Sequence, residues 1–123
     1  MKLMIVEDHT GIRKRICALL ARANVEIREC STGEEAIPAA REFLPDWVVM
    51  DVNLNGMNGF EATKTICREV PCARVVVISA EGPDDRNYLH QEAAASGAEQ
   101  FLSKHRLAQL PGILYDSPQP PAA

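Results

Sequence analysis

The sequence has few aromatic residues, no excess of positive charge and no long apolar segment. Phe, Trp and Tyr make up 5% of its 123 residues, and the formal net charge is −4. Nucleic-acid-binding surfaces are usually basic, and those for single strands carry aromatic rings on which bases stack, so direct contact with nucleic acid is not expected. A membrane-spanning helix needs about 20 consecutive apolar residues. The start, MKLMIVEDH, has too short an apolar stretch, and its acids come too early, for a signal peptide. We therefore expect a cytoplasmic protein without membrane contact.

Two familiar kinds of site pattern are also missing. No two cysteines form C-x-x-C, and no histidines stand at zinc-finger spacing, so reduced, packed thiols are expected rather than a zinc site or a disulfide framework. The segment GMNG (56–59) has neither the Walker spacing nor the G-x-G-x-x-G pattern of phosphate-binding loops. Any chemistry must therefore come from other polar residues.

Short apolar runs alternate with segments of helical periodicity along the chain. A Ser/Thr cap signal places the start of one helix near residue 32, and Pro38 should kink or interrupt that helix. The final helix is expected over 106–115 and contains Pro111. Each expected strand is followed by a helix, and the strands are 2–6, 25–30, 47–50, 74–79 and 99–103. The strand over 25–30 alternates apolar and polar residues at first, so it is expected at an edge of the sheet. The segment DDRNYLHQEAAASG (84–97) is expected to form a helix with an Asp cap and a Gly stop.

This alternation predicts an α/β fold in one domain. Parallel strands joined by helices give a flavodoxin-like, doubly wound, five-stranded parallel sheet, with strand order 2-1-3-4-5 and five helices. The domain is expected to cover residues 1–115. The last segment, DSPQPPAA (116–123), is rich in proline and small residues, so it is expected to be a disordered tail or the start of a linker.

Polar residues stand at the carboxyl ends of four expected strands. The first strand runs into Glu7 and Asp8, the third into Asp51, the fourth into Ser79 and the fifth into Lys104. Because these ends share one edge of a parallel sheet, the side chains should lie close together, and ligands of such sheets bind at this edge. Crowded carboxylates repel one another, and a hard cation such as Mg²⁺ relieves this while keeping positions open for phosphate oxygens. The set therefore predicts a Mg²⁺ site where a carboxylate, Asp51, accepts a phosphoryl group.

The same residues resemble the receiver domain of two-component response regulators, in particular the single-domain chemotaxis regulators. The resemblance covers about 1–115. It rests on four segments in order: IVED (5–8), VVMDVNLNGMNGFE (48–61), VVVISA (75–80) and FLSK (101–104). Departures from the family pattern are Glu7 in place of Asp, Asn55 and His105 in place of Pro, and Asn58 in place of Asp.

For the metal and the acceptor, the resemblance implies specific roles. Asp51 would take the phosphoryl group from a phosphohistidine and also bind Mg²⁺. Asp8 would bind the metal directly, Glu7 would help directly or through water, and the backbone carbonyl of Asn53 would be a further ligand. Lys104 would pair with the phosphoryl group.

For the switch, the resemblance implies that Ser79 hydrogen-bonds the phosphoryl group and that Phe101 turns inward when Ser79 shifts. The small Ala80 would leave room near the site. Asn53 and Glu81 would tune dephosphorylation, and we expect a short-lived phosphoryl state. Of the nearby residues, His9 is expected to cap a helix, whereas Arg13, Lys14 and Arg15 could form either a solvated helix face or a docking surface.

The expected function is that of a phosphorylatable signalling switch, not an enzyme, which assists its own phosphorylation and dephosphorylation. Its partners would be a sensor histidine kinase or a histidine phosphotransfer protein and an unknown downstream protein, with a phosphorylation-linked dimer as a further option. Three alternatives stand beside it: a phosphorylation-independent binding module, a Mg²⁺-dependent phosphatase and a flavin-binding module. The phosphatase usually needs a second acid where Asn53 stands, and the acids of EDHTGI (7–12) would repel a flavin phosphate.

Overall fold

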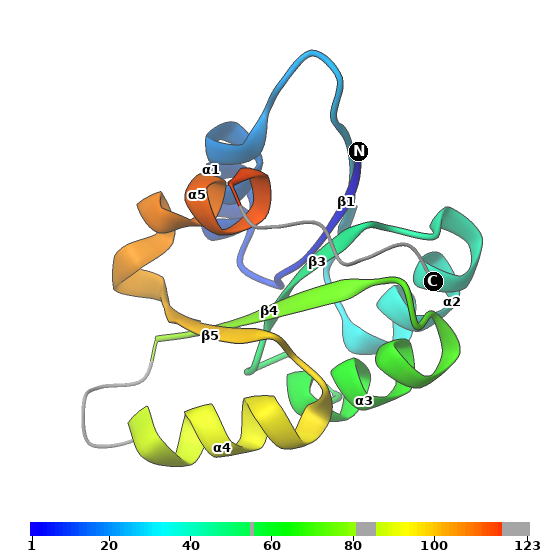
Figure 1. Ribbon diagram of the computed structural model, residues 1–123, viewed down its shortest axis with the longest axis vertical. Coiled ribbons are helices and arrows are strands. Elements are labelled where there is room, and N and C mark those ends of the chain that lie inside the picture. The colour runs from blue at the N-terminus through cyan, green and yellow to red at the C-terminus, as the bar shows by residue number, and fades with distance from the viewer. Residues whose placement is uncertain (55, 81–85, 117–123) are drawn as a thin grey trace.

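The computed structural model describes residues 1–54, 56–80 and 86–116 and forms one parallel sheet between two layers of helices (Figure 1). The strands lie in the order β2-β1-β3-β4-β5, and every neighbouring pair is parallel. This confirms the predicted fold, strand order and five α-helices. The elements are β1 (Lys2–Val6), α1 (Thr10–Leu20), β2 (Glu26–Cys30), α2 (Gly33–Phe43), β3 (Trp47–Asp51), α3 (Gly59–Glu69), β4 (Arg74–Ser79), α4 (Arg86–Ser96), β5 (Gln100–Ser103), the 3-10 helix η2 (Lys104–Gln109) and α5 (Leu110–Tyr115).

Two hydrophobic clusters, one on each face of the sheet, hold the layers together. Helices α1 and α5 cover one face, and α2, α3 and α4 cover the other (Figure 1). Alternate residues of β3 enter opposite clusters: Val48 and Met50 join one, Trp47 and Val49 the other. Every residue of β3 is buried, as expected of a central strand in a parallel sheet. The edge strand β2 is only partly covered, as its alternating sequence predicts.

Helix α2 begins where the sequence predicts but is not interrupted by Pro38. The hydroxyl of Thr32 caps the helix by accepting from the Glu35 N–H at 3.0 Å. The helix then runs through Pro38 to Phe43, so the prediction of an interruption is wrong. Pro38 cannot donate to the carbonyl of Glu34. Both residues are exposed, so water can bond to that carbonyl and the helix tolerates the loss.

The last helical segment differs from the single helix predicted over 106–115. It consists of η2 followed by the short helix α5, because the backbone of Arg106 leaves helical geometry (φ −121°, ψ 27°). Pro111 lies in the first turn of α5, where its missing N–H removes no intrahelical bond. The hydroxyl of Tyr115 donates to the carbonyl of Leu20 at the end of α1, and the Arg22 guanidinium lies 3.8 Å from the centre of the Tyr115 ring. These contacts connect α5, the last helix of the domain, to the end of α1, the first.

Two smaller predictions concern the ends of α4. The expected Gly stop is confirmed, since Gly97 follows the helix with a φ of +98°. The expected Asp cap at 84 or 85 lies outside the described residues. Among the helices of the described segments, none has the length and apolar character needed to cross a membrane.

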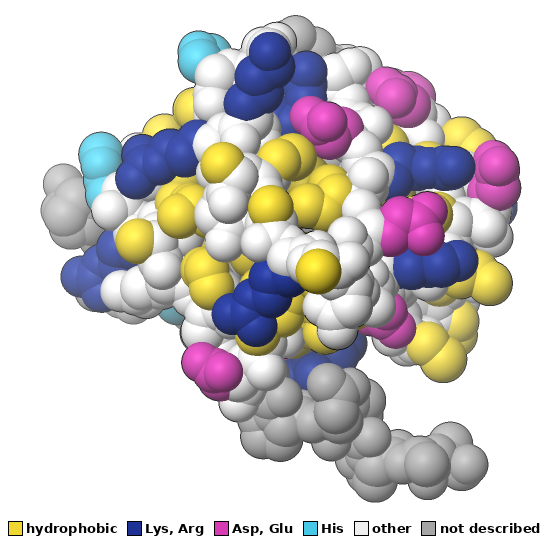
Figure 2. All heavy atoms as spheres, turned by 90° about the horizontal axis from the view of Figure 1, so that it is seen from above, with side chains coloured by type: hydrophobic (Ala, Val, Ile, Leu, Met, Phe, Trp, Pro, Cys, Tyr) yellow, Lys and Arg dark blue, Asp and Glu magenta, His cyan; other side chains and the backbone are white. Residues whose placement is uncertain are grey.

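The surface over α1 and α5 carries charges of both signs. Viewed from above (Figure 2), hydrophobic side chains lie in the middle of this face, with Lys and Arg side chains interspersed with Asp and Glu around them. This face therefore lacks the uniformly basic character of a nucleic-acid-binding surface.

Candidate functional site

The acidic residues predicted to meet at the sheet edge do lie together there. Glu7 follows β1 and Asp51 ends β3, and these strands are neighbours, with Val6 opposite Met50. Glu7 is 0% exposed and Asp51 is 1% exposed, so both carboxyl groups are removed from bulk water. Asp8 is partly exposed at the rim. Two buried carboxyl groups at one place need a positive charge or a proton to be tolerated.

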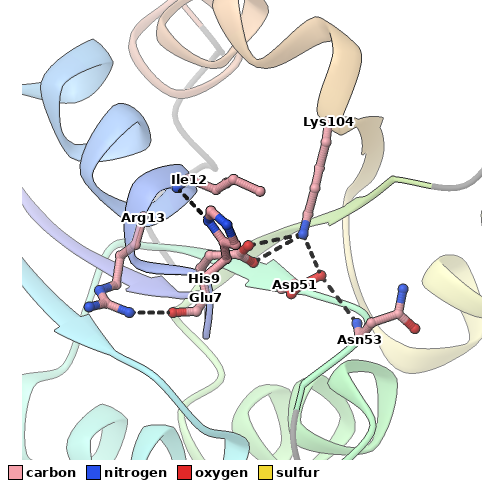
Figure 3. Close-up of polar contacts among 7 residues, drawn as sticks. All are labelled: Glu7, His9, Ile12, Arg13, Asp51, Asn53 and Lys104. Atoms are coloured by element: carbon pink, nitrogen blue, oxygen red, sulfur yellow. Dashed lines mark hydrogen bonds and ion pairs between the residues drawn. The ribbon is translucent and has the colours of Figure 1, made fainter.

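Lys104 supplies the positive charge. Its side chain extends from the start of η2 toward both carboxyl groups (Figure 3). The Lys104 Nζ donates to Glu7 Oε1 at 3.0 Å and Oε2 at 3.3 Å, and it lies 3.2 Å from Asp51 Oδ1. Its side chain is 14% exposed. Within the described part of the chain, no buried side-chain nitrogen or oxygen atom lacks a hydrogen-bond partner, so the site satisfies its own polar groups.

The raised pKa of Glu7 shows that this buried position disfavours its charged form. The pKa of Glu7 is raised to about 8, mainly by burial; the hydrogen bond to Asp51 and the charge of Asp51 also raise it, whereas the hydrogen bond to Lys104 and the charge of Lys104 lower it. Burial lowers the pKa of Lys104, but its hydrogen bond to Glu7 and the charge of Asp51 outweigh burial, so this pKa is raised. With a pKa near 8, Glu7 holds a proton over much of the neutral range, which leaves Lys104 to balance the charge of Asp51.

The donor set fits a hard divalent cation. One carboxylate oxygen from each of Glu7, Asp8 and Asp51 lies within 4.8 Å of the others. Mg²⁺ uses few protein carboxylates and keeps water or phosphate oxygens in its remaining positions. A cation here would also stabilise the charged form of Glu7, which burial and the nearby Asp51 disfavour. The chemistry of these three groups therefore suits Mg²⁺, with Glu7 having to exchange its contact with Lys104 for the metal.

The loop after Asp51 is built to hold that carboxylate. The backbone N–H of Asn53 donates to Asp51 Oδ1 at 3.1 Å (Figure 3). Asn53 pairs with Asn58 through an isolated antiparallel bridge, and Asn58 caps α3 by accepting from the Phe60 N–H at 2.7 Å. A Cβ on Gly59 would lie 2.0 Å from the backbone oxygen of Asp51, so only glycine fits there. The role of the Asn53 carbonyl as a metal ligand stays a prediction.

The predicted switch residues lie on the two neighbouring strands. Ser79 is fully buried at the end of β4, one residue beyond Ile78, which pairs with Asp51. Phe101 is buried on β5, and its ring meets the ring of His90 edge-on with the centroids 5.0 Å apart. Ala80 is exposed after β4. Glu81, the expected partner of Asn53 in dephosphorylation, lies outside the described residues.

Arg13 has a structural role that the sequence analysis missed. Its guanidinium donates to the backbone oxygen of Glu7 at 2.8 Å and pairs with Glu29 at 3.1 Å, and the side chain is only 17% exposed. It is therefore neither a solvated residue nor a free docking residue, whereas Lys14 and Arg15 are exposed. Its helical spacing from Ile16 and Leu20, which face the core, was the available signal.

His9 behaves as the sequence predicts. It is the N-cap of α1, and its Nδ1 accepts from the Ile12 N–H at 3.2 Å. The contacts of His9 and Arg13 together therefore fix the segment that follows Glu7 and Asp8.

Comparisons with known proteins identify the family to which this fold and sequence correspond. The family described as "Response regulator receiver domain" matches residues 3–112. Chemotaxis protein CheY from Thermotoga maritima is 33% identical over 104 residues, covering 84% of this chain and 84% of that protein. Transcriptional regulatory protein LiaR from Bacillus subtilis is 37% identical over 106 residues, covering 85% of this chain and 49% of LiaR. The chain thus spans about half the length of LiaR, and 59% of response regulator GacA from Pseudomonas syringae.

Solved structures of response regulators have the same fold. A two-component response regulator of the LuxR family from Aurantimonas sp. SI85-9A1 superposes with a TM-score of 0.79 at 29% identity, covering 89% of this chain and 78% of that one. Chemotaxis protein CheY4 from Vibrio cholerae superposes with a TM-score of 0.72 at 28% identity, covering 84% of this chain and 85% of that one.

Proposed function

Because the chain belongs to the response regulator receiver domain family, we propose that it is a phosphorylatable switch in which Asp51 accepts a phosphoryl group from a phosphohistidine. The observation that carries this proposal is the buried cluster of Asp51, Glu7 and Lys104 at the carboxyl edge of the sheet. A carboxylate held beside a lysine, with a further carboxylate pair for a cation, is what transfer of a phosphoryl group to an oxygen requires.

In the proposed reaction an Asp51 carboxylate oxygen attacks the phosphorus of the phosphohistidine. The new O–P bond forms as the P–N bond breaks, and the imidazole leaves with the electron pair and takes up a proton. Lys104, whose Nζ is 3.2 Å from Asp51 Oδ1, is within reach of a phosphoryl group attached to Asp51. The N–H of Asn53 holds Oδ1 in place meanwhile. Positioning and charge neutralisation of this kind provide most of the catalysis in phosphoryl transfer.

Mg²⁺ is the proposed cofactor. Asp8, Asp51 and the backbone carbonyl of Asn53 would bind it, with Glu7 helping directly or through water. When bound, the ion neutralises charge on the carboxylates and on the phosphoryl oxygens. This chain's own contribution is to bring the carboxylates together and to hold the Lys104 Nζ 3.2 Å from Asp51 Oδ1.

The output of the switch is proposed to pass through Ser79 and Phe101. The Ser79 hydroxyl would bond to the phosphoryl group, and the resulting shift of β4 would change the packing of Phe101 against His90. Beside Phe101 lies a cavity of about 220 Å³ at the surface of α4, β5 and η2. A downstream protein, or a second copy of the phosphorylated domain, would bind the switched surface better than the resting one. The residues lining the cavity are His90, Gln100, Phe101, Leu102, Ser103, Arg106 and Gln109.

One observation favours a second candidate, a binding module that needs no phosphorylation. The contact of Lys104 with Glu7 at 3.0 Å satisfies the buried carboxyl groups without a metal. If Glu7 kept that contact in the presence of Mg²⁺, the acceptor site would stay closed. The domain would then act through its resting surface alone.

Intact-mass spectrometry after incubation with acetyl phosphate, with and without Mg²⁺, tests the proposal. We expect a Mg²⁺-dependent gain of one phosphoryl group, about 80 Da, in the native protein and none in Asp51→Asn. Failure of the native protein to gain mass at saturating Mg²⁺ would favour the phosphorylation-independent module. A gain that persists in Asp51→Asn would show that another residue is the acceptor.

A further inference from the structure

The start of helix α2 and the loop after Asp51 interlock through two glycines. Met57 in the loop lies against Gly33, so that a Cβ on Gly33 would be 3.0 Å from both Cβ and Sδ of Met57. Reciprocally, Glu34 lies against Gly56, where a Cβ would be 2.9 Å from Glu34 Oε1. Gly56 also has a φ of +89°, which disfavours any other residue. Each segment thus carries a glycine that receives a side chain from the other.

A short path leads from this contact to the acceptor. Met57 immediately precedes Asn58, which caps α3 and forms the antiparallel bridge to Asn53. The N–H of Asn53 bonds to Asp51 Oδ1 at 3.1 Å. Met57 also packs against the core cluster beneath the loop. Displacing Met57 must therefore move or loosen the Asn53–Asn58 bridge, and with it the backbone that touches the Asp51 carboxylate.

We propose that Gly33 and Met57 are positioning residues for the acceptor site: α2, docked through Met57, fixes the Asn53 backbone and thereby sets the Mg²⁺ affinity. This inference rests on the proposed function, since it concerns the same site. Its physical basis is close packing, because a methyl group on Gly33 meets the Cβ of Met57, which cannot rotate away as its sulfur can.

The test uses variants of graded size and a matched control. Gly33→Ala should displace Met57 slightly and Gly33→Val should displace it more. Met57→Gly removes the whole side chain that the new group would meet, Cβ included. Gly112→Ala is the control, since Gly112 is exposed in α5 and a Cβ there would only come within 3.8 Å of Asp116 Oδ2. Urea unfolding of each variant selects the conditions under which all are folded.

Two readouts on each folded variant decide the question. Titration with Mg²⁺ alone, followed by calorimetry, should show a dissociation constant raised about tenfold in Gly33→Val, the scale seen when groups supporting metal ligands are altered, and unchanged in Gly112→Ala. Hydrogen exchange of the Asn53 amide in metal-free protein should be faster in Gly33→Val. In the Met57→Gly background, Gly33→Val should have no further effect on either quantity, because the two positions act through one contact.

The outcomes separate this inference from the proposed function. If the dissociation constant and the Asn53 exchange rate in Gly33→Val equal those of the native protein, the inference is wrong, and this result leaves the proposed phosphorylation of Asp51 unaffected. Equal effects of Gly33→Val with and without Met57 would also overturn it. If the native protein binds no Mg²⁺, the metal part of the proposed function fails, and exchange at Asn53 alone then decides whether Met57 positions the loop.

Discussion

Lys104 and Glu7, 97 positions apart in the chain, form the hydrogen bond that closes the candidate site, with Nζ 3.0 Å from Oε1. The pair joins the end of β1 to the residue that follows β5, across the central strand that carries Asp51. In the metal-free protein it holds together two carboxyl groups that would otherwise repel. The same pair must loosen when a cation or a phosphoryl group arrives.

The first prediction concerns stability and pH without metal. The pKa of Glu7 is raised from 4.5 to about 8 in the folded protein, so the folded state binds more protons than the unfolded state between these values. The free energy of unfolding should therefore fall as the pH rises from about 5 to 8, by at most about 1.4 kcal/mol per pH unit for one proton. Urea unfolding in EDTA measures this. Glu7→Gln should flatten the slope, and an equally steep slope in that variant would assign the proton to another group.

The second prediction concerns Mg²⁺ binding and pH. Glu7 must lose its proton for the cluster to hold a cation. The dissociation constant for Mg²⁺ should therefore decrease as the pH rises from 6 to 8, by up to about tenfold per pH unit. Calorimetry in buffers of different ionisation enthalpy should also detect release of a proton on binding. Glu7→Gln serves as the control: it should bind Mg²⁺ more weakly than the native protein does at pH 8, and with little pH dependence. Binding to the native protein that does not vary with pH would contradict the prediction.

The third prediction separates two basic residues of α1. Arg13 donates to the backbone oxygen of Glu7, so Arg13→Ala should lower the free energy of unfolding by about 2 kcal/mol, the scale for a hydrogen bond from a charged group. Lys14→Ala, an exposed neighbour, should change it by less than about 0.5 kcal/mol. Urea unfolding at constant pH compares them. Similar small effects in both variants would mean that Arg13 does not hold the end of β1.

The fourth prediction concerns the lifetime of the phosphoryl group. Asn53 stands beside the acceptor with an exposed side chain, where its amide can hold an attacking water. The phosphoryl group should therefore decay within minutes, and Asn53→Ala should slow the decay several-fold while still accepting the group on Asp51. Intact-mass spectrometry after removal of acetyl phosphate follows both. A half-life of many hours in the native protein would refute the idea of a short-lived state.

The sequence was sufficient for the features that depend on chain periodicity. The strand over 74–79 has the predicted bounds, and the gathering of Glu7, Asp51 and Lys104 follows from the rule that parallel strands bring their carboxyl ends to one edge. Features set by contacts between distant segments were missed. The contact of Arg13 with the Glu7 carbonyl depends on how α1 packs on β1.

The same limit applies to the prolines and to the loop after Asp51. Whether Pro38 breaks a helix depends on whether water reaches the freed carbonyl of Glu34, and that is a matter of exposure in the folded protein. The packing of Met57 on Gly33 joins segments more than twenty positions apart, so no local sequence pattern predicts it. Sequence reasoning thus located the charged groups but not the contacts that orient them.

The fastening of Tyr115 to the carbonyl of Leu20 has a consequence for synthesis of the protein. The two residues are 95 positions apart, so α5 cannot pack against α1 until almost the whole domain has been translated. Until then the apolar side chains of Ile16 and Leu20, which are fully buried in the finished domain, lack the cover that α5 provides. A nascent chain therefore completes this side of its core only after Tyr115 has left the ribosome, and before that point the exposed apolar face of α1 is a surface through which incomplete chains can associate.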